Sequence, residues 1–113
     1  MIPYDDFAKL ELRVATVISA DRVNGSEKLL RIKVDCGHST DTEQADIRQI
    51  VAGIGKSYEP EALVGKQIVI IANLEPRTLM GEESRGMLLA ADSEGGPVLI
   101  VPDIRVAAGA KIK

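Results

Sequence analysis

Residues 73 to 87 carry several strong hydrogen-bond donors in a short polar and charged segment. The donors are an amide, two guanidinium groups and a hydroxyl, contributed by Asn73, Arg77, Arg85 and Ser84. Donors of these types suit the phosphate and ribose oxygens of a nucleic acid. Taken alone, the segment also fits an ordinary glycine-containing connection with solvated charges, so both interpretations stand at this point.

Apolar runs flank this segment and are expected to hold both of its ends. The run 67–73 precedes it and the run 86–91 follows it, and both are typical of strands in a barrel core. Earlier in the chain, apolar and polar residues alternate over 11–20, 29–35 and 47–54, which predicts three more strands. The donor-rich segment is therefore expected to be a long, structured loop between the fourth and fifth strands.

A short helix is predicted over 59–65, between the third and fourth strands. Pro60 would occupy its first position and Gly65 its C-terminal stop. A single helical turn is also expected near the N-terminus, where Asp5 and Asp6 suit a helix start. Three strands, a short helix and two more strands are the order of the all-β OB-fold, a five-stranded Greek-key barrel.

The two ends of the chain fall outside this minimal barrel. We expect a single domain over residues 1–113, with a core of about 8–92 and extensions at 1–7 and 93–113. The C-terminal extension holds an additional apolar strand at 98–101. Apolar residues in both extensions would be partly exposed on a monomer, and a two-fold dimer would cover them. The expected interface residues are Ile2, Pro3, Tyr4, Val98, Leu99 and Ile100.

Composition sets limits on the class of protein. With 113 residues, of which 45% are hydrophobic, the chain fits one domain with a core of ordinary size. No apolar run is long enough to span a membrane and no signal-peptide pattern opens the chain, so we expect a soluble, cytoplasmic protein with no membrane partner. The net charge of −3 counts against indiscriminate binding to polyanions. Basic residues nevertheless alternate with apolar ones at Arg13, Arg31, Lys33 and Arg48, which predicts one locally basic face.

The sequence offers little for catalysis or metal binding. The run 53–57 lacks the first glycine of a phosphate-binding P-loop, because Ile50 occupies that position. The single cysteine, Cys36, and the single histidine, His38, are too few for a structural zinc site without carboxylate help. The acidic segment 41–46 lacks the central glycine of a calcium loop. We therefore expect no enzyme activity, no metal and no cofactor.

Aromatic residues are scarce, with no Trp, one Phe and two Tyr. The chain therefore cannot build the ladder of stacking platforms with which many OB-folds hold single strands. Folded RNA can be bound through phosphates, ribose and shape without such a ladder. If nucleic acid is the ligand, composition favours structured RNA over single-stranded DNA.

Motifs along nearly the whole chain resemble those of the tRNA-binding domain family. The matching stretches are 6–14, 28–37, 48–54, 58–66, Asn73-Leu-Glu-Pro-Arg77 and Met80-Gly-Glu-Glu-Ser-Arg-Gly-Met87 with the apolar residues up to Ala91. Members of this family include the C-terminal domain or separate beta chain of methionyl-tRNA synthetase and a free-standing dimeric tRNA-binding protein.

The resemblance implies a noncatalytic OB-fold homodimer that binds tRNA by its overall shape, without sequence specificity. It also implies that the chain raises the tRNA affinity of a methionyl-tRNA synthetase, whose catalytic chain is then a further partner, or acts as a free-standing protein. Carried onto matching positions, the expected tRNA-binding residues are Lys28, Lys33, Asn73, Arg77, Met80, Ser84 and Met87, with Arg31, Arg48 and Arg85 as electrostatic support.

Two departures from the family pattern affect this prediction. Residues 23–27 read Val-Asn-Gly-Ser-Glu where the family commonly has His-Pro-x-Ala-Asp, and Glu75 stands where a lysine is frequent. The lost cation is expected to lower the affinity or to move the contact. Residues 36–45 are expected to form a polar hairpin loop.

Two rival functions fit the same fold. One is an export-type molecular chaperone with a similar dimeric OB-fold, which would present an apolar groove to unfolded peptides. The other is a purely structural dimerisation module, which would not bind tRNA.

Overall fold

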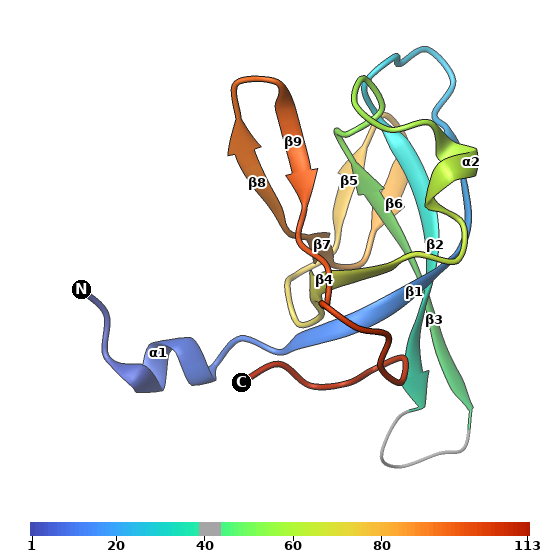
Figure 1. Cartoon of the computed structure of the whole chain (residues 1–113). Coiled ribbons are helices and arrows are strands. Elements are labelled where there is room, and N and C mark those ends of the chain that lie inside the picture. Colours follow the sequence, from blue (N-terminus) through green and yellow to red (C-terminus); the bar gives the residue numbers. More distant parts are fainter. Residues whose placement is uncertain (39–43) are drawn as a thin grey trace.

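The longest strand, β1 (Leu12–Arg22), is the middle strand of the five-stranded sheet. The computed structural model describes residues 1–38 and 44–113. β1 pairs antiparallel with β2 (Leu30–His38) and with β4 (Gln67–Ile71). β3 (Ala45–Ala52) extends the sheet beyond β2 and β7 (Met87–Leu88) extends it beyond β4, which gives the order β3-β2-β1-β4-β7 (Figure 1).

The sheet is curled, so that its two outer strands, β3 and β7, approach each other. The backbone N–H of Arg85, just before β7, donates to the carbonyl oxygen of Gln49 on β3 over 2.9 Å. The helix α2 (Pro60–Leu63) lies between β3 and β4 in the chain and begins with Pro60, as predicted. The all-β OB-fold class, with a five-stranded sheet and one short helix between its third and fourth strands, is therefore confirmed.

The core is formed by alternate residues of the curled sheet. In β2, Leu30, Ile32 and Val34 are buried, whereas Arg31 and Lys33 lie on the outer face. The other buried members of the same cluster come from β1, β3, β4, α2 and the segments beside them, and include Ala15, Val17, Ile50, Ile54, Leu63, Ile68 and Ile70. The period-two pattern of the sequence thus places the charged residues of β2 outside the barrel.

β2 and β3 pair over most of their length. Their register runs from Leu30 opposite Ala52 to Asp35 opposite Ile47, and it shifts before His38. Residues 39–43, which form the middle of the predicted polar loop, lie outside the described residues.

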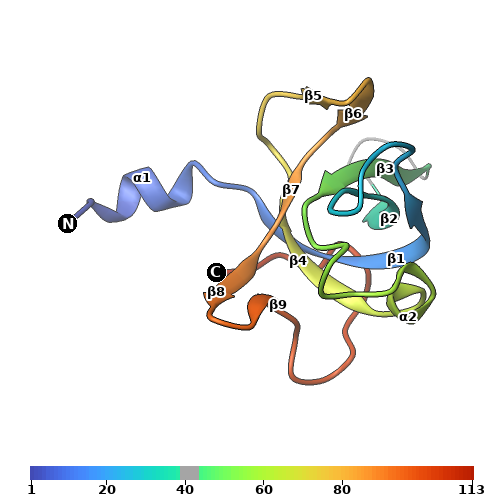
Figure 2. The ribbon, with the colours of Figure 1, turned by 90° about the horizontal axis from the view of Figure 1, so that it is seen from above.

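The donor-rich segment after β4 contains a two-stranded hairpin that the sequence did not predict. Its strands are β5 (Arg77–Leu79) and β6 (Glu82–Ser84), and the hairpin stands out from the barrel (Figures 1 and 2). Each strand has only three residues, which is too short for hydrophobic periodicity to indicate it. The predicted loop is structured, and its structure is this ribbon.

The predicted fifth strand at 86–91 is divided in the structure. Its first part, β7, pairs with β4, whereas its second part, β8 (Ala90–Ser93), pairs with β9 (Gly96–Leu99). Leu89 marks the division, because its N–H donates to Val69 of β4 and its carbonyl accepts from Ile100. β8 and β9 form a second hairpin. The observed bounds of β4, Gln67–Ile71, differ from the predicted 67–73, and those of β9, Gly96–Leu99, differ from the predicted 98–101.

The C-terminal tail lies alongside the first residues of β1. Val14 accepts a backbone hydrogen bond of 2.7 Å from Gly109 and donates one of 2.9 Å to Ala110. The tail also passes close to the end of β2, and this approach requires two glycines, since a Cβ on Gly109 would lie 2.5 Å from the carbonyl oxygen of Cys36 and a Cβ on Gly37 would lie 2.5 Å from the carbonyl oxygen of Ala108. Both glycines also have positive φ, which residues with a Cβ rarely adopt.

The N-terminal residues form a short arm that projects away from the barrel (Figures 1 and 2). Its helix α1 (Tyr4–Ala8) has Asp5 and Asp6 in its first turn, as predicted. Across 1–38 and 44–113, no helix has the length and apolar character needed to cross a membrane.

Candidate nucleic-acid interface

The β5–β6 hairpin carries several of the predicted contact residues on a tight turn. Arg77 pairs with Ser84 and Leu79 pairs with Glu82, so only Met80 and Gly81 form the turn. Both turn residues have positive φ, 49° at Met80 and 81° at Gly81. A two-residue turn with both φ values positive favours Asn or Gly, so Met80 holds a conformation that is unfavourable for its residue type.

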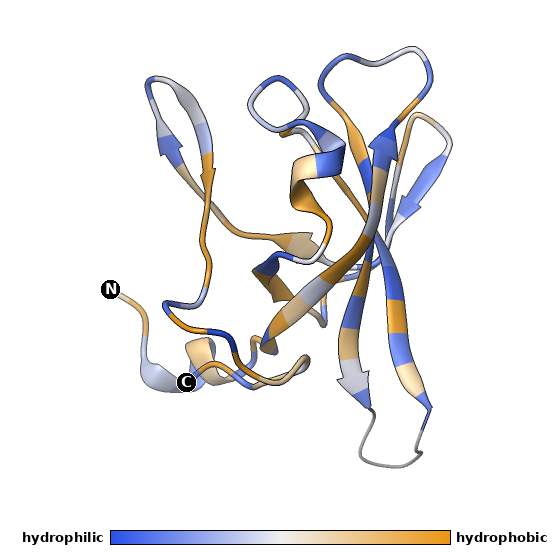
Figure 3. Ribbon diagram, turned by 45° about the vertical axis from the view of Figure 1, so that its right-hand side comes forward, coloured by the Kyte–Doolittle hydropathy of each residue, from blue (hydrophilic) through white to orange (hydrophobic). Residues whose placement is uncertain are grey.

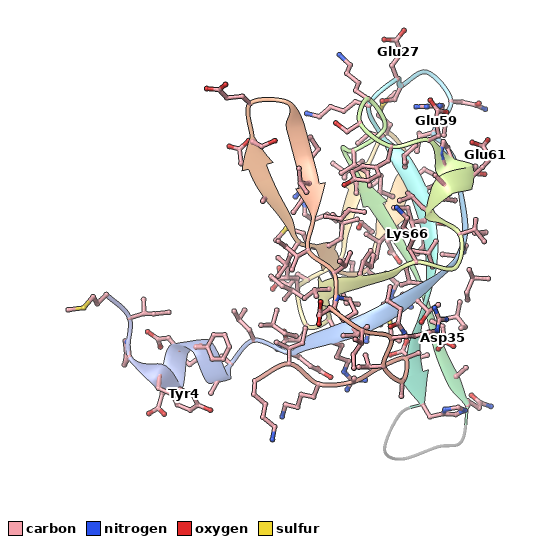
Figure 4. The ribbon with its side chains drawn as sticks, in the orientation of Figure 1. Tyr4, Glu27, Asp35, Glu59, Glu61 and Lys66 are labelled. Carbon is pink, nitrogen blue, oxygen red and sulfur yellow. The ribbon has the colours of Figure 1, made fainter. Side chains whose placement is uncertain are left out.

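The tip of the hairpin lies beside the turn that joins β1 to β2. A Cβ on Gly25 would be 3.5 Å from the terminal methyl of Met80, although the two residues are far apart in sequence. Both segments rise from the same end of the barrel in Figure 1, and Figure 4 places the side chain of Glu27 at the top of that turn. Lys28 follows Glu27 and is exposed. The tertiary structure thus brings Met80 beside the turn that carries Lys28, whose side chain extends over Gly53.

Ser84 fastens the base of the hairpin to the barrel. Its side chain is 5% exposed, its Oγ accepts the N–H of Val51 over 2.9 Å, and its hydroxyl donates to the carbonyl of Gly86 over 3.0 Å. Both hydrogen-bonding functions of this hydroxyl are therefore used within the protein. The predicted contribution of Ser84 to tRNA binding would act through the position of the hairpin.

Arg31, on the outer face of β2, is held between two carboxylates. Its Nε and one terminal nitrogen donate to Asp21 over 3.0 and 2.8 Å, and its other terminal nitrogen donates to Glu82 of β6. The hydrogen bond from Arg31 holds the pKa of the Asp21 carboxyl below its usual range, and the same pairing raises the pKa of Arg31. The guanidinium predicted as electrostatic support for RNA is thus committed to protein partners.

Arg48 and Asn73 also have partners inside the protein. Arg48 donates to the carboxylate of Asp46 over 3.0 Å and to the carbonyl of Ala72, and its hydrogen bond to Asp46 raises the pKa of Arg48. The amide of Asn73 accepts the N–H of Glu11 over 2.8 Å and donates to the carbonyl of Lys9 over 2.7 Å. Arg48 therefore joins β3 to the end of β4, and Asn73 fixes the start of β1.

The locally basic face predicted from the alternating residues is largely neutralised. Arg13 pairs with Glu11, as Arg31 and Arg48 pair with the acids described above. Lys33 is exposed on the outer face of β2, and its register partner on β3 is Gln49. Four basic residues predicted this face, and three of them are paired with carboxylates. Within the part of the chain that the structure describes, Lys33 has no carboxylate within 4.0 Å.

Arg77, Arg85, Met80 and Met87 are the exposed predicted residues of the hairpin region. Arg85 lies 3.8 Å from Glu83, a distance at the outer range of an ion pair, whereas Arg77 has no carboxylate within 4.0 Å among residues 1–38 and 44–113. Arg77 and Met87 line a small hollow of about 60 Å³ beneath the hairpin, together with Glu75. The hairpin therefore presents a free guanidinium next to a carboxylate that lowers the local positive potential.

The predicted dimer residues divide into exposed and buried positions. Ile2, Pro3, Tyr4, Val98 and Ile100 are exposed. Leu99 was expected to be partly exposed, but it is 8% exposed because it packs into the core cluster of its own chain. The N–H of Leu99 also donates to the hydroxyl of Tyr58 over 3.0 Å. That expectation of exposure was wrong, since adjacent residues of a strand point to opposite faces.

Cys36 is a buried packing residue. Burial raises the pKa of its thiol to about 11, and the nearby charge of Asp46 acts in the same direction. Among the described residues, no group of three His, Cys, Asp or Glu side chains is placed to hold a metal ion.

Two residues that position the hairpin, Glu82 and Gln49, were not predicted from the sequence. Glu82 accepts hydrogen bonds from Arg31 and Gln49, and the amide nitrogen of Gln49 also donates to the carbonyl of Glu83 over 2.9 Å. These contacts join residues more than thirty positions apart in the chain. The alternation of apolar and polar residues in β2 and β3 puts Arg31 and Gln49 on the outer face. That alternation is the one feature of the sequence that could have suggested these contacts.

Comparison with known proteins identifies similar chains. A family model described as "Putative tRNA binding domain" matches residues 12–111. A methionine–tRNA ligase from Methanothrix thermoacetophila is 55% identical over 113 residues, which cover 100% of this chain and 16% of that protein. The chain thus spans a small part of the length of this curated relative.

Two solved structures share the fold over their whole length. A MetRS related protein from Pyrococcus horikoshii has a TM-score of 0.86 and 32% sequence identity, with 100% of this chain and 98% of that chain covered. A chaperone CsaA from Bacillus anthracis has a TM-score of 0.85 and 32% identity, with 100% and 99% covered.

Proposed function

Because the chain belongs to the tRNA-binding domain family, we propose that it binds tRNA by shape, without catalysing a reaction, as a homodimer in the cytoplasm. One observation carries the proposal: an exposed, fixed hairpin presents Arg77 and the strained Met80 beside the turn that carries Lys28. Cations on a rigid ribbon suit phosphates, and a methionine at the tip suits the apolar face of a base or ribose.

The proposed contacts are a subset of the residues predicted from the sequence. Lys28, Lys33, Arg77 and Arg85 supply positive charge, and Met80 and Met87 supply apolar contact. Arg31, Arg48, Asn73 and Ser84 contribute by fixing the elements that carry these side chains, because their polar groups are bonded within the protein. Glu75, beside Arg77, makes the binding weaker than a lysine at the same position would.

The identity with part of a methionine–tRNA ligase supports a role beside a synthetase. A tRNA-binding domain that is linked to, or associated with, the catalytic chain would raise the local concentration of tRNA at the active site. Its contribution would appear as a lower KM for tRNA, because the domain itself takes no part in the chemistry.

A homodimer would cover the apolar surface next to the β8–β9 hairpin. Val98, Ile100, Val101 and Ile104 are 50%, 42%, 52% and 72% exposed. Figure 3 shows the hydrophobic colouring of β9 continuing into the segment that follows it. The projecting arm adds Ile2 and Tyr4, and Figure 4 shows Tyr4 pointing away from the barrel. Exposed apolar residues on two extensions favour pairing with a second copy.

The proposal is tested by measuring the affinity for unmodified tRNA transcripts as a function of salt. We expect log Kd to rise linearly with log salt concentration, with a slope of about 0.7 to 0.9 per neutralised phosphate. Arg77→Gln should weaken binding by about three- to tenfold and lower this slope by about one phosphate equivalent.

Arg105→Gln is the matched control, because it removes the same charge from a residue whose terminal nitrogen donates to Gly65, far from the hairpin in sequence and in contacts. It should leave the affinity within about twofold of the wild-type value. Absence of tRNA binding at low salt would contradict the proposed function. Equal losses for both variants would assign binding to overall charge instead of the hairpin.

A peptide-binding chaperone is the second candidate, and the similarity to the Bacillus anthracis chaperone supports it. The exposed apolar surface at Val98 and Ile100 suits unfolded polypeptide as well as a second copy of the chain. A competition experiment between tRNA and a chemically denatured protein separates the candidates. Stronger binding of the denatured protein, with no effect of Arg77→Gln, would favour the chaperone.

A further inference from the structure

The guanidinium of Arg31 joins the barrel to the β5–β6 hairpin. It bonds Asp21 of β1 through two nitrogens and Glu82 of β6 through the third. We propose that Arg31 and Glu82 form a latch that holds the hairpin in its tRNA-binding position, so that both are positioning residues and not tRNA contacts. The role in tRNA binding rests on the proposed function, whereas the latch itself can be tested without RNA.

The latch has a third member, Gln49, on β3. Gln49 donates to the other carboxylate oxygen of Glu82 over 3.2 Å and to the carbonyl of Glu83 over 2.9 Å. Both oxygens of Glu82 are therefore engaged, one by β2 and one by β3. Arg31 and Glu82 are about two-thirds buried, with side-chain exposures of 31% and 28%, so solvent screens their pairing less than it screens an exposed pair.

The hairpin needs such an attachment because it is small. Each strand has three residues, and an isolated two-stranded ribbon of this kind is marginally stable in water. Its turn also contains Met80 at a φ of 49°, and this unfavourable backbone conformation lowers the stability of the hairpin. Ser84 and Arg85 hold the base of the hairpin. The part of the hairpin next to the turn is held by Glu82, which directly follows the turn.

The latch predicts an effect opposite to that of simple electrostatics. Removing a carboxylate from a surface that binds a polyanion should tighten binding if only charge matters. If Glu82 holds the hairpin, its removal should weaken binding, because a mobile hairpin is in the binding position for only part of the time. The sign of the change in affinity therefore distinguishes the two roles.

Glu82→Gln and Glu83→Gln form a matched pair for this test. The two residues are neighbours of the same type, but Glu83 is 60% exposed and lies 3.8 Å from Arg85. We expect Glu82→Gln to weaken tRNA binding by about three- to tenfold, as for the loss of one good hydrogen-bonded contact, and Glu83→Gln to leave it unchanged or tighter. Equal effects of the two variants, or tighter binding by Glu82→Gln, would overturn the latch.

Arg31→Lys tests the other side of the latch while keeping the positive charge. A lysine cannot bond Asp21 and Glu82 together through a planar fork, so we expect the same loss as for Glu82→Gln. The double variant should lose no more than either single variant, because both remove the same contact. An unchanged affinity for Arg31→Lys, or fully additive losses, would show that the two residues act independently.

Hydrogen exchange measured by NMR, on the protein without RNA, separates failure of the latch from failure of the proposed function. The reporters are the N–H of Val51, bonded to Ser84, and the N–H of Arg85, bonded to Gln49. Glu82→Gln should accelerate their exchange by about three- to tenfold relative to Glu83→Gln. Unchanged exchange would refute the latch, whereas faster exchange in a protein that does not bind tRNA would refute only the proposed function.

Discussion

Two hairpins leave the same barrel, and they differ in how they are attached. The β5–β6 hairpin is fastened by polar groups, namely the hydroxyl of Ser84, the carboxylate of Glu82 and the backbone of Arg85. The β8–β9 hairpin is fastened by the apolar side chain of Leu99 and by the hydrogen bond from its N–H to Tyr58, and backbone hydrogen bonds at its base join Leu89 and Ile100 to Val69 of β4. Polar attachment fixes direction as well as proximity, because hydrogen bonds weaken steeply with angle.

The two turns differ as well. The β5–β6 turn places a methionine at positive φ, whereas in the β8–β9 hairpin the residue at positive φ is Gly96, which tolerates it. Unfavourable backbone conformation at a non-glycine residue is a common property of functional sites. We therefore expect the polar, strained hairpin to hold its side chains in fixed directions, and the apolar hairpin to bury its exposed side chains against a second copy.

The largest expected effect is at the attachment of the β8–β9 hairpin. Leu99→Ala should lower the free energy of unfolding by about 2 to 4 kcal/mol, because it removes a buried side chain from the core and leaves a cavity. Chemical denaturation measures this change.

Val98→Asp is the control for that prediction, since Val98 is the neighbour of Leu99 on the same strand and points outward. It should leave the fold intact and weaken self-association, which sedimentation equilibrium measures. A large loss of stability in a monomeric Val98→Asp protein, or no change in self-association, would contradict the division of β9 into a core face and a dimer face.

An intermediate effect is expected at the base of the β5–β6 hairpin. Ser84→Ala should lower the free energy of unfolding by about 1 to 2 kcal/mol, because the buried N–H of Val51 loses its acceptor. It should also weaken tRNA binding, because the hairpin is less firmly held.

Ser93→Ala in the other hairpin is the matched control. The hydroxyl of Ser93 donates to the carbonyl of Gly96 on the exposed surface, and its loss should change stability by no more than about 0.5 kcal/mol. If both serine variants were equally stable, Ser84 would not be the fastening point inferred from its burial.

The smallest effect is expected at the strained turn. Met80→Asn should raise the free energy of unfolding by about 0.5 to 1 kcal/mol, because Asn adopts positive φ more easily. The same variant should bind tRNA a few-fold more weakly, because the apolar tip is lost. Stability and affinity measured on one preparation test both statements, and tighter binding by Met80→Asn would exclude Met80 as a contact.

Much of the fold was predictable from the sequence. Alternation of apolar and polar residues indicated β1, β2 and β3, and Pro60 with Gly65 indicated α2. These signals are local, since each depends on residues within a single element. The β5–β6 hairpin was not predicted, because three-residue strands carry too little periodicity, and the strand predicted at 86–91 is divided between β7 and β8, which pair according to tertiary contacts.

The family, the OB-fold order and the set of polar residues from which the candidate site is built could all be inferred from the sequence alone. Which of those residues are free to meet a ligand depends on the tertiary structure, because ion pairing and burial involve neighbours distant in the chain. Arg31 and Arg77 are the same residue type, yet Arg31 is held by Asp21 and Glu82 while Arg77 stands exposed on the hairpin. Sequence alternation gives the face on which a side chain lies, but the partner on that face is set by the packing of another element.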